Sequence, residues 1–183
     1  MIVMMDIREA KITDAAGIAR VHIDTWRSAY AGIVPADHLA NMTYERCENR
    51  HRDELSDAGR VSFTFVADID GTVVGFACGG PERSGDRFFK GELYAIYVRP
   101  EFHRQGIGWA LATTIMRRLI EQGCTSMVVW ALKDNQCRAF YEKLGGRYVG
   151  DKEIVIGGAS LVEVAYGWDD LHNATDHPIG GAQ

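Results

Sequence analysis

Two periods of apolar and polar positions run along the chain, and they divide it into strands and helices. Residues 61–67 alternate as a strand does, and residues 72–78 return as its hairpin partner after an Asp-Ile-Asp-Gly turn. A helix is predicted after a cap at Thr13-Asp14. Its buried face consists of residues that recur at steps of three and four: Ala15, Ile18, Ala19, His22 and Trp26.

The second half of the chain contains denser apolar segments. Residues 92–98 predict a central strand, and residues 126–132 are typical of a strand that is buried on both faces. Between them, a helix is predicted from about Gly108 to Gln122, with a stop at Gly123. The remaining predicted elements are a strand at 7–10, a helix from about residue 36 into the fifties, a helix from Asp134 or Asn135 to about Leu144, and two strands at 153–156 and 161–168.

The order of these elements is β-α-α-β-β-β-α-β-α-β-β. It predicts an α/β (α+β) fold with a mixed, mostly antiparallel sheet of about seven strands and helices on both faces. The length of 183 residues fits a single domain, which we place at residues 1–170. Residues 171–183 are polar and glycine-rich, and we expect a flexible tail there.

Composition and charge exclude several classes of function. The formal net charge of −5 argues against nonspecific nucleic-acid binding, which needs a basic face. No segment approaches the ~18–20 apolar residues of a membrane span. The four cysteines (Cys47, Cys78, Cys124 and Cys137) show no paired spacing, so we expect neither a zinc site nor a disulfide framework. These features predict a cytoplasmic protein without a membrane or nucleic-acid partner and without a metal.

The segment with the clearest chemistry is the strand at 92–98 together with the turn and helix that follow it. The turn His103-Arg-Gln-Gly-Ile-Gly108 is basic and opens directly into the helix. Backbone N–H groups at a helix N-terminus attract anions, and a glycine allows a ligand to approach closely. The sequence therefore predicts a site for a diphosphate.

Two common diphosphate-binding motifs do not fit the spacing. A dinucleotide fold requires G-x-G-x-x-G, but Leu111 stands at the third glycine position, and no carboxylate lies about twenty residues further on. A nucleotide-triphosphate loop requires a Gly-Lys pair, which this chain does not contain.

The segment resembles the coenzyme A loop of the Gcn5-related N-acetyltransferases, whose pattern is [Q/R]-x-x-G-x-[G/A] after a strand that ends V-x-P. This chain has Val98-Arg-Pro100 and then the turn at 103–108, with His103 where the family has Gln or Arg. Residues 130–146 are similar to the family's second cofactor segment, although Asn135 and Tyr141 are six rather than seven positions apart. The resemblance covers roughly residues 6–169.

The resemblance implies that acetyl-CoA is the donor and that no metal takes part. It implies donor contacts at the following positions: Ile96, Tyr97, Val98, His103, Arg104, Gln105, Gly106, Ile107, Gly108, Trp109, Ala110, Asn135, Arg138 and Tyr141. A free backbone N–H at 96–98 would bond the thioester carbonyl, and the Tyr141 hydroxyl is a suitable proton donor to the leaving thiolate.

Four further residues are candidates for the acceptor side. Glu92 is the best candidate for the general base, and Tyr94 is expected to share its face of the strand. A solvated carboxylate is the competing interpretation of Glu92. Trp26 and Tyr30 are four positions apart and are candidates for an aromatic wall against the amine, although aromatic residues at helical spacing more often pack in the core.

The sequence thus predicts an acetyl-CoA-dependent N-acetyltransferase that acts on a primary amine of a small molecule, or of a peptide, by direct transfer in a ternary complex. A noncatalytic acyl-CoA-binding module is the alternative, and transfer of a longer acyl chain is a third interpretation for which the bulk of Tyr97 is decisive. Many members of the family are dimers, so a homodimer is expected.

Overall fold

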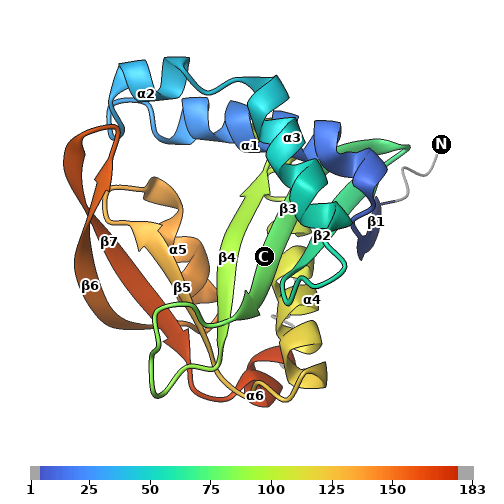
Figure 1. Ribbon diagram of the computed structural model, residues 1–183. Coiled ribbons are helices and arrows are strands. Elements are labelled where there is room, and N and C mark those ends of the chain that lie inside the picture. The colour runs from blue at the N-terminus through green and yellow to red at the C-terminus, as the bar shows by residue number, and fades with distance from the viewer. Residues whose placement is uncertain (1–4, 177–183) are drawn as a thin grey trace.

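The computed structural model describes residues 5–176, and it confirms the predicted sheet with helices on both faces (Figure 1). The strands are β1 (Met5–Glu9), β2 (Phe63–Ile69), β3 (Thr72–Pro81), β4 (Gly91–Val98), β5 (Met127–Leu132), β6 (Arg147–Ile156) and β7 (Ala159–Trp168). The helices are α1 (Ala15–Ala29), α2 (Ala36–Ala40), α3 (Tyr44–Ser56), α4 (Ile107–Glu121), α5 (Ala139–Lys143) and α6 (Leu171–Asp176). None of these helices is long and apolar enough to cross a membrane.

The seven strands follow the order β1-β2-β3-β4-β5-β7-β6. Every neighbouring pair is antiparallel except β4 and β5, which run parallel. On one face α1 buries Ile18 and Val21 against Val66 and Phe76. On the other face the apolar stripe of α4 joins the main core, as its four-residue spacing predicts.

The predicted helix from residue 36 into the fifties is two helices, so this prediction is wrong in its extent. The chain leaves helical geometry at Thr43, whose backbone is extended. The Thr43 hydroxyl oxygen accepts a hydrogen bond from the Arg46 N–H at 3.4 Å and thereby caps α3. Thr43 is a start signal inside an otherwise polar segment, and such a signal outweighs helix propensity.

Two later boundaries also differ from the prediction. Asn135 caps a 3-10 turn at Gln136–Arg138, and α5 begins only at Ala139. Strand β6 starts at Arg147 rather than at residue 153, because its polar first half pairs along the whole of β7. Antiparallel pairing decides the length of such an edge strand, and apolar alternation alone does not reveal it.

The first part of the predicted tail is a helix, so flexibility from residue 171 onward is wrong for Leu171–Asp176. Leu171 has an exposed fraction of 0 % in the main core, and its N–H donates to the Thr125 carbonyl at 2.8 Å. One fully buried leucine anchors this short segment. Residues 177–183 of the expected tail lie outside the described residues.

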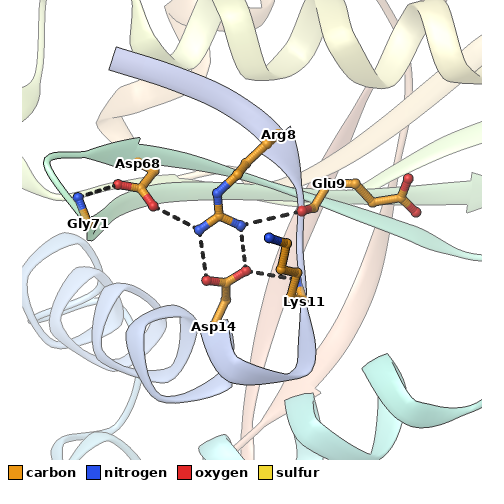
Figure 2. A network of polar contacts seen from close by, with 6 residues as sticks. All are labelled: Arg8, Glu9, Lys11, Asp14, Asp68 and Gly71. Atoms are coloured by element: carbon orange, nitrogen blue, oxygen red, sulfur yellow. Dashed lines mark hydrogen bonds and ion pairs between the residues drawn. The ribbon is translucent and has the colours of Figure 1, made fainter. Parts of the chain in front are cut away.

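A polar network fixes β1 to the start of the first helix (Figure 2). The Arg8 guanidinium lies 2.7 Å from a carboxylate oxygen of Asp14 and 2.7 Å from one of Asp68. Asp14 also accepts the Lys11 N–H at 2.7 Å, and Asp68 accepts the Gly71 N–H in the β2–β3 turn at 2.7 Å. One guanidinium therefore joins the edge strand, the start of α1 and the first hairpin.

We predict that Asp14→Asn lowers the free energy of unfolding by about 1–2 kcal/mol at pH 7, because it removes a charged partner of Arg8. The hydrogen bond from Arg8 holds the pKa of Asp14 below its usual value. Because the folded-state pKa is lowered, the ionised Asp14 stabilises the fold above the unfolded pKa of about 3.9. This stabilisation is lost as the pH falls through the folded pKa. The measurement is urea unfolding at several pH values.

The difference between the wild type and Asp14→Asn should therefore shrink below about pH 4. Asp53→Asn is the control, since Asp53 is exposed on α3. A stability difference for Asp14→Asn that is equal at pH 7 and pH 3 would contradict the role of the network.

Candidate active site

Strands β4 and β5 separate early, and this separation creates the candidate site. They pair only from Gly91 to Leu93, and then they diverge toward their carboxyl ends (Figure 1). A bulge lies at the same point, because Gly79 opposes Leu93 while the preceding Cys78 opposes Ala95. The extra residue is Tyr94, where β4 changes from buried to partly exposed. A bulge bends and twists a strand, which explains the end of pairing with β5.

The register of β3 and β4 shows which backbone groups remain without a strand partner. The Arg99 N–H donates to the Val74 carbonyl at 2.9 Å. In an antiparallel pair, alternate residues direct their N–H groups toward the partner, so the N–H of Tyr97 also faces β3. The N–H groups of Ile96 and Val98 face the side on which β5 has diverged. Two of the three predicted backbone contacts thus have the required orientation, whereas the Tyr97 N–H is directed at β3.

The glycine turn follows directly at the end of β4. Arg104 and Gly106 have positive φ angles of 61° and 79°, which turn the chain sharply into α4. Among residues 5–176, the backbone N–H groups of 104–108 have no hydrogen-bond partner. They sit at the positive end of the α4 dipole, as an anion site requires.

The side chains of the turn are placed in different ways. The His103 Nε2 donates to the Val98 carbonyl at 2.8 Å, so this ring ties the turn to the strand end. Gln105 is exposed and donates to the Glu101 carbonyl at 3.3 Å. Ile107 is buried, whereas Arg104 is exposed and its charge is available beside the free N–H groups. The sequence predicted donor contacts for all these residues. In the structure, the His103 ring and the Ile107 side chain instead make contacts within the protein.

The first turn of α4 packs against α5. A Cβ at Gly108 would lie 3.4 Å from the Phe140 ring, so a glycine allows the close approach. Trp109 and Ala110 are partly buried, and Trp109 lines an open pocket with Lys143 and Arg147. Arg147 is already paired with Asp169, which lines the same pocket, with its Nη2 2.8 Å from a carboxylate oxygen.

The two other cofactor candidates stand before α5. The Asn135 side chain accepts the Cys137 N–H at 2.9 Å, so it acts as a cap. Arg138 carries a buried Nε without a partner among the described residues. A buried donor without a partner is costly, and a bound acceptor would satisfy it.

Tyr141 on α5 is buried, and its ring stacks on Tyr166 with centroids 5.7 Å apart. Burial raises the pKa of Tyr141, and the nearby Tyr97 and Cys137 raise it further. The hydroxyl therefore keeps its proton at neutral pH, which is the form that a proton donor needs. The structure brings Tyr141 and the end of β4 together, as predicted.

Helix α1 supplies the aromatic side of the site. The Trp26 Nε1 donates to the Tyr97 hydroxyl at 3.0 Å, and the rings of Trp26 and Tyr30 meet edge to face at 4.9 Å. Burial raises the pKa of Tyr30, with further contributions from Tyr97 and Tyr141. Trp26 and Tyr30, the residue that caps the end of α1, also pack with Val34, Leu39 and Leu132, so packing and an aromatic wall are compatible interpretations.

Glu92 lies at the paired end of β4, and the interpretation of it as a solvated carboxylate is wrong. It is 5 % exposed, and its Oε2 accepts from the backbone N–H and the Nε of Arg83, each at 3.1 Å. The Arg83 guanidinium also lies 3.8 Å from the centroid of the Tyr94 ring. Glu92 and Tyr94 therefore both contact Arg83. No contact joins Glu92 to Tyr97 or Tyr141 in the described part of the chain.

Sequence reasoning missed two charged residues at the site, Arg83 and Glu163. Arg83 lies in the loop before β4, and only the folded hairpin shows that it covers Glu92. Burial raises the pKa of Tyr97, and the negative charge of Glu163 on β7 adds to this effect. The alternation of β7 places Glu163 on the same face as Leu161, but no motif marks it.

Comparisons with known proteins agree with this geometry. The sequence profile of the acetyltransferase (GNAT) family matches residues 20–146. The uncharacterized N-acetyltransferase YuaI of Bacillus subtilis (strain 168) is 39 % identical over 169 residues, which are 92 % of this chain and 95 % of YuaI.

Solved structures show the same fold at lower identity. The PaiA N-acetyltransferase of Thermoplasma acidophilum, in complex with coenzyme A, has a TM-score of 0.68 and 21 % identity, over 88 % of this chain and 98 % of that one. YncA of Salmonella typhimurium, solved with its cofactor acetyl-CoA, has a TM-score of 0.67 and 19 % identity, over 98 % of each chain. With a family profile over most of its length and a relative of this similarity, the chain belongs to the GNAT family and is an N-acetyltransferase.

Proposed function

We propose that this enzyme uses acetyl-CoA as donor and transfers the acetyl group directly to a primary amine in a ternary complex. The observation that carries the proposal is the set of unpaired backbone N–H groups at Ile96, Val98 and residues 104–108, which lie in one continuous segment. PaiA and YncA, which share the fold, hold coenzyme A and acetyl-CoA. A small-molecule amine is the favoured acceptor, and a peptide is the alternative.

The two ends of the donor fit two parts of this segment. A diphosphate carries negative charge and fits the N–H groups of residues 104–108 and the exposed Arg104. An extended amide chain fits the free edge of β4, because Ile96 and Val98 present N–H and C=O groups there. The Tyr97 ring is fixed by Trp26, and its bulk favours an acetyl over a longer acyl group.

The proposed reaction forms a C–N bond and breaks a C–S bond. The amine nitrogen attacks the thioester carbonyl carbon, and the Ile96 N–H stabilises the charge that develops on the carbonyl oxygen. The thiolate leaves and takes the proton of the Tyr141 hydroxyl. The amine loses its extra proton to a base, and that proton returns to Tyr141 through solvent. No covalent enzyme intermediate is needed.

Glu92 is proposed as the base, with Arg83 as the residue that controls it. The carboxylate is held by Arg83 at the paired end of β4, so a water chain must connect it to the acceptor. Arg83 is exposed in its loop, with a side-chain exposure of 60 %, so it is free to move when an acceptor binds.

We predict that Tyr141→Phe lowers kcat about 10²-fold and leaves the affinity for acetyl-CoA within about two-fold, because only the proton donor is lost. Turnover across an amine panel and calorimetric titration measure the two quantities. Tyr166→Phe is the matched control, since it removes a hydroxyl from the ring that stacks on Tyr141. Equal donor affinity with no turnover of any amine by the wild type would favour the noncatalytic acyl-CoA-binding module.

Gly106→Ala should weaken acetyl-CoA binding about ten-fold and destabilise the fold by about 1–2 kcal/mol, because an L-residue at φ 79° is strained. Gly123→Ala is the matched control: its φ is 81°, and no atom lies within 4 Å of an added Cβ at either position. Gly123 lies at the other end of α4, so the control should lose stability and keep its affinity. Calorimetry with NADH as a negative ligand measures the effect, and equal affinity in both variants would exclude the turn as the donor site.

Glu92→Gln should lower kcat at least about ten-fold. Arg83→Met breaks the same ion pair but keeps the carboxylate, so it separates the two roles of Glu92. If Glu92 is the base, Arg83→Met should retain turnover, and only Glu92→Gln should lose it. Equal losses in both variants, with equal falls in melting temperature, would show that the ion pair is structural.

A further inference from the structure

A second group of reactive side chains lies between α1 and α3, outside the proposed acetyl-transfer site. His22 comes from α1, and Cys47 and His51 come from adjacent turns of α3. Their ligating atoms all lie within 4.8 Å of one another, and Cys47 and His51 are buried. The proposed acetyl transfer uses none of these side chains.

The orientation of His51 is set by a carboxylate. The Nδ1 of His51 lies 3.3 Å from a carboxylate oxygen of Glu54 on the same helix. A carboxylate only accepts hydrogen bonds, so Nδ1 carries the proton and the Nε2 lone pair points the other way. It points toward the Nδ1 of His22, at 3.3 Å. A histidine that donates to a carboxylate and presents its other nitrogen is the usual arrangement of a metal ligand.

A positive group already occupies the point where the three side chains converge. The Arg50 Nη2 lies 3.3 Å from the His22 Nδ1 and 3.7 Å from the Cys47 sulfur. A guanidinium only donates, so the lone pair of His22 also points inward. One guanidinium nitrogen therefore contacts His22 and Cys47, and His51 lies 3.3 Å from the same nitrogen of His22. Because 54 % of the Arg50 side chain is exposed, it can leave toward solvent.

The spacing fits a tetrahedral metal ion. Zinc binds histidine nitrogen at ~2.0–2.1 Å, and two such ligands in a tetrahedron stand ~3.3–3.4 Å apart. The separation of the His22 and His51 nitrogens is 3.3 Å. Nitrogen and sulfur ligands together favour zinc over magnesium or calcium.

We infer that His22, Cys47 and His51 form a Zn²⁺ site, in which the metal replaces the Arg50 guanidinium and water completes the coordination. Binding converts the Cys47 thiol to a thiolate and releases one proton to solvent, with no redox change. Cysteine spacing did not predict this site, because the four cysteines have no paired spacing and two of the three ligands are histidines. One of these histidines also comes from a different helix.

The site would clamp α1 to α3 behind the aromatic side of the acetyl-transfer site. The His22 ring lies 5.3 Å from the Tyr97 ring and 5.8 Å from the Trp26 ring, measured between centroids. A metal on His22 would therefore restrain Tyr97 and Trp26 without touching the reacting atoms. This role is structural and does not depend on the proposed donor or acceptor.

The test uses the full-length protein after removal of metal with EDTA. Zn²⁺ is titrated by calorimetry and Co²⁺ by absorbance, because a Co²⁺–thiolate bond gives a charge-transfer band. We expect one equivalent of each metal, a rise in melting temperature with Zn²⁺, and loss of the Co²⁺ band in Cys47→Ser. Cys124→Ser is the control cysteine and should bind as the wild type does.

If Cys47→Ser fails to fold, Arg50→Ala provides a second test of the inference. Removal of the competing guanidinium should raise the affinity for Zn²⁺ about ten-fold or more. Absence of stoichiometric binding by the wild-type protein would overturn the inference, whatever the variants do. Binding that persists with an unchanged Co²⁺ band in Cys47→Ser, or an affinity that Arg50→Ala does not change, would overturn it as well.

Discussion

The early end of the pairing between β4 and β5 is the constraint on which the rest of the site depends. The bulge at Tyr94 bends β4 away after only three paired positions, and the two strands are parallel, so their open ends point the same way. Loops that follow the carboxyl ends of parallel strands gather at one edge of a sheet. The glycine turn after β4 and the α5 segment after β5 therefore meet there, although about thirty residues of chain separate them.

The same bulge divides β4 into two chemical environments. On the paired side, Glu92 is buried and held by Arg83. On the open side, Tyr97 lies with Trp26 and Tyr30, and no carboxylate contacts their hydroxyl or indole groups within residues 5–176. Burial raises the pKa of Tyr30, Tyr97 and Tyr141, so these phenols stay neutral at physiological pH. A neutral, aromatic side and a charged, buried side thus lie on one strand.

The sequence predicted those features that depend on neighbouring residues. The hairpin at 61–78, the turn at 103–108 and the helix after it follow from alternation and glycine placement, and Tyr141 follows from its motif. Contacts between distant segments were not predictable, because neither partner carries a signal of its own. The pairing of Glu92 with Arg83 needs the fold of a polar loop, and the approach of His22 to His51 needs the packing of two helices.

The Arg8 network has a consequence for the order in which the chain folds. Arg8 is six positions from Asp14 but sixty from Asp68, so one of its partners is local and the other distant. The local pair can form with the first turn of α1, whereas Asp68 is in place only after the β2–β3 turn has closed. Closing a long loop costs entropy that later contacts must offset. The edge strand β1 should therefore dock after the hairpin, and the amides of β1 should be among the last to gain protection from hydrogen exchange.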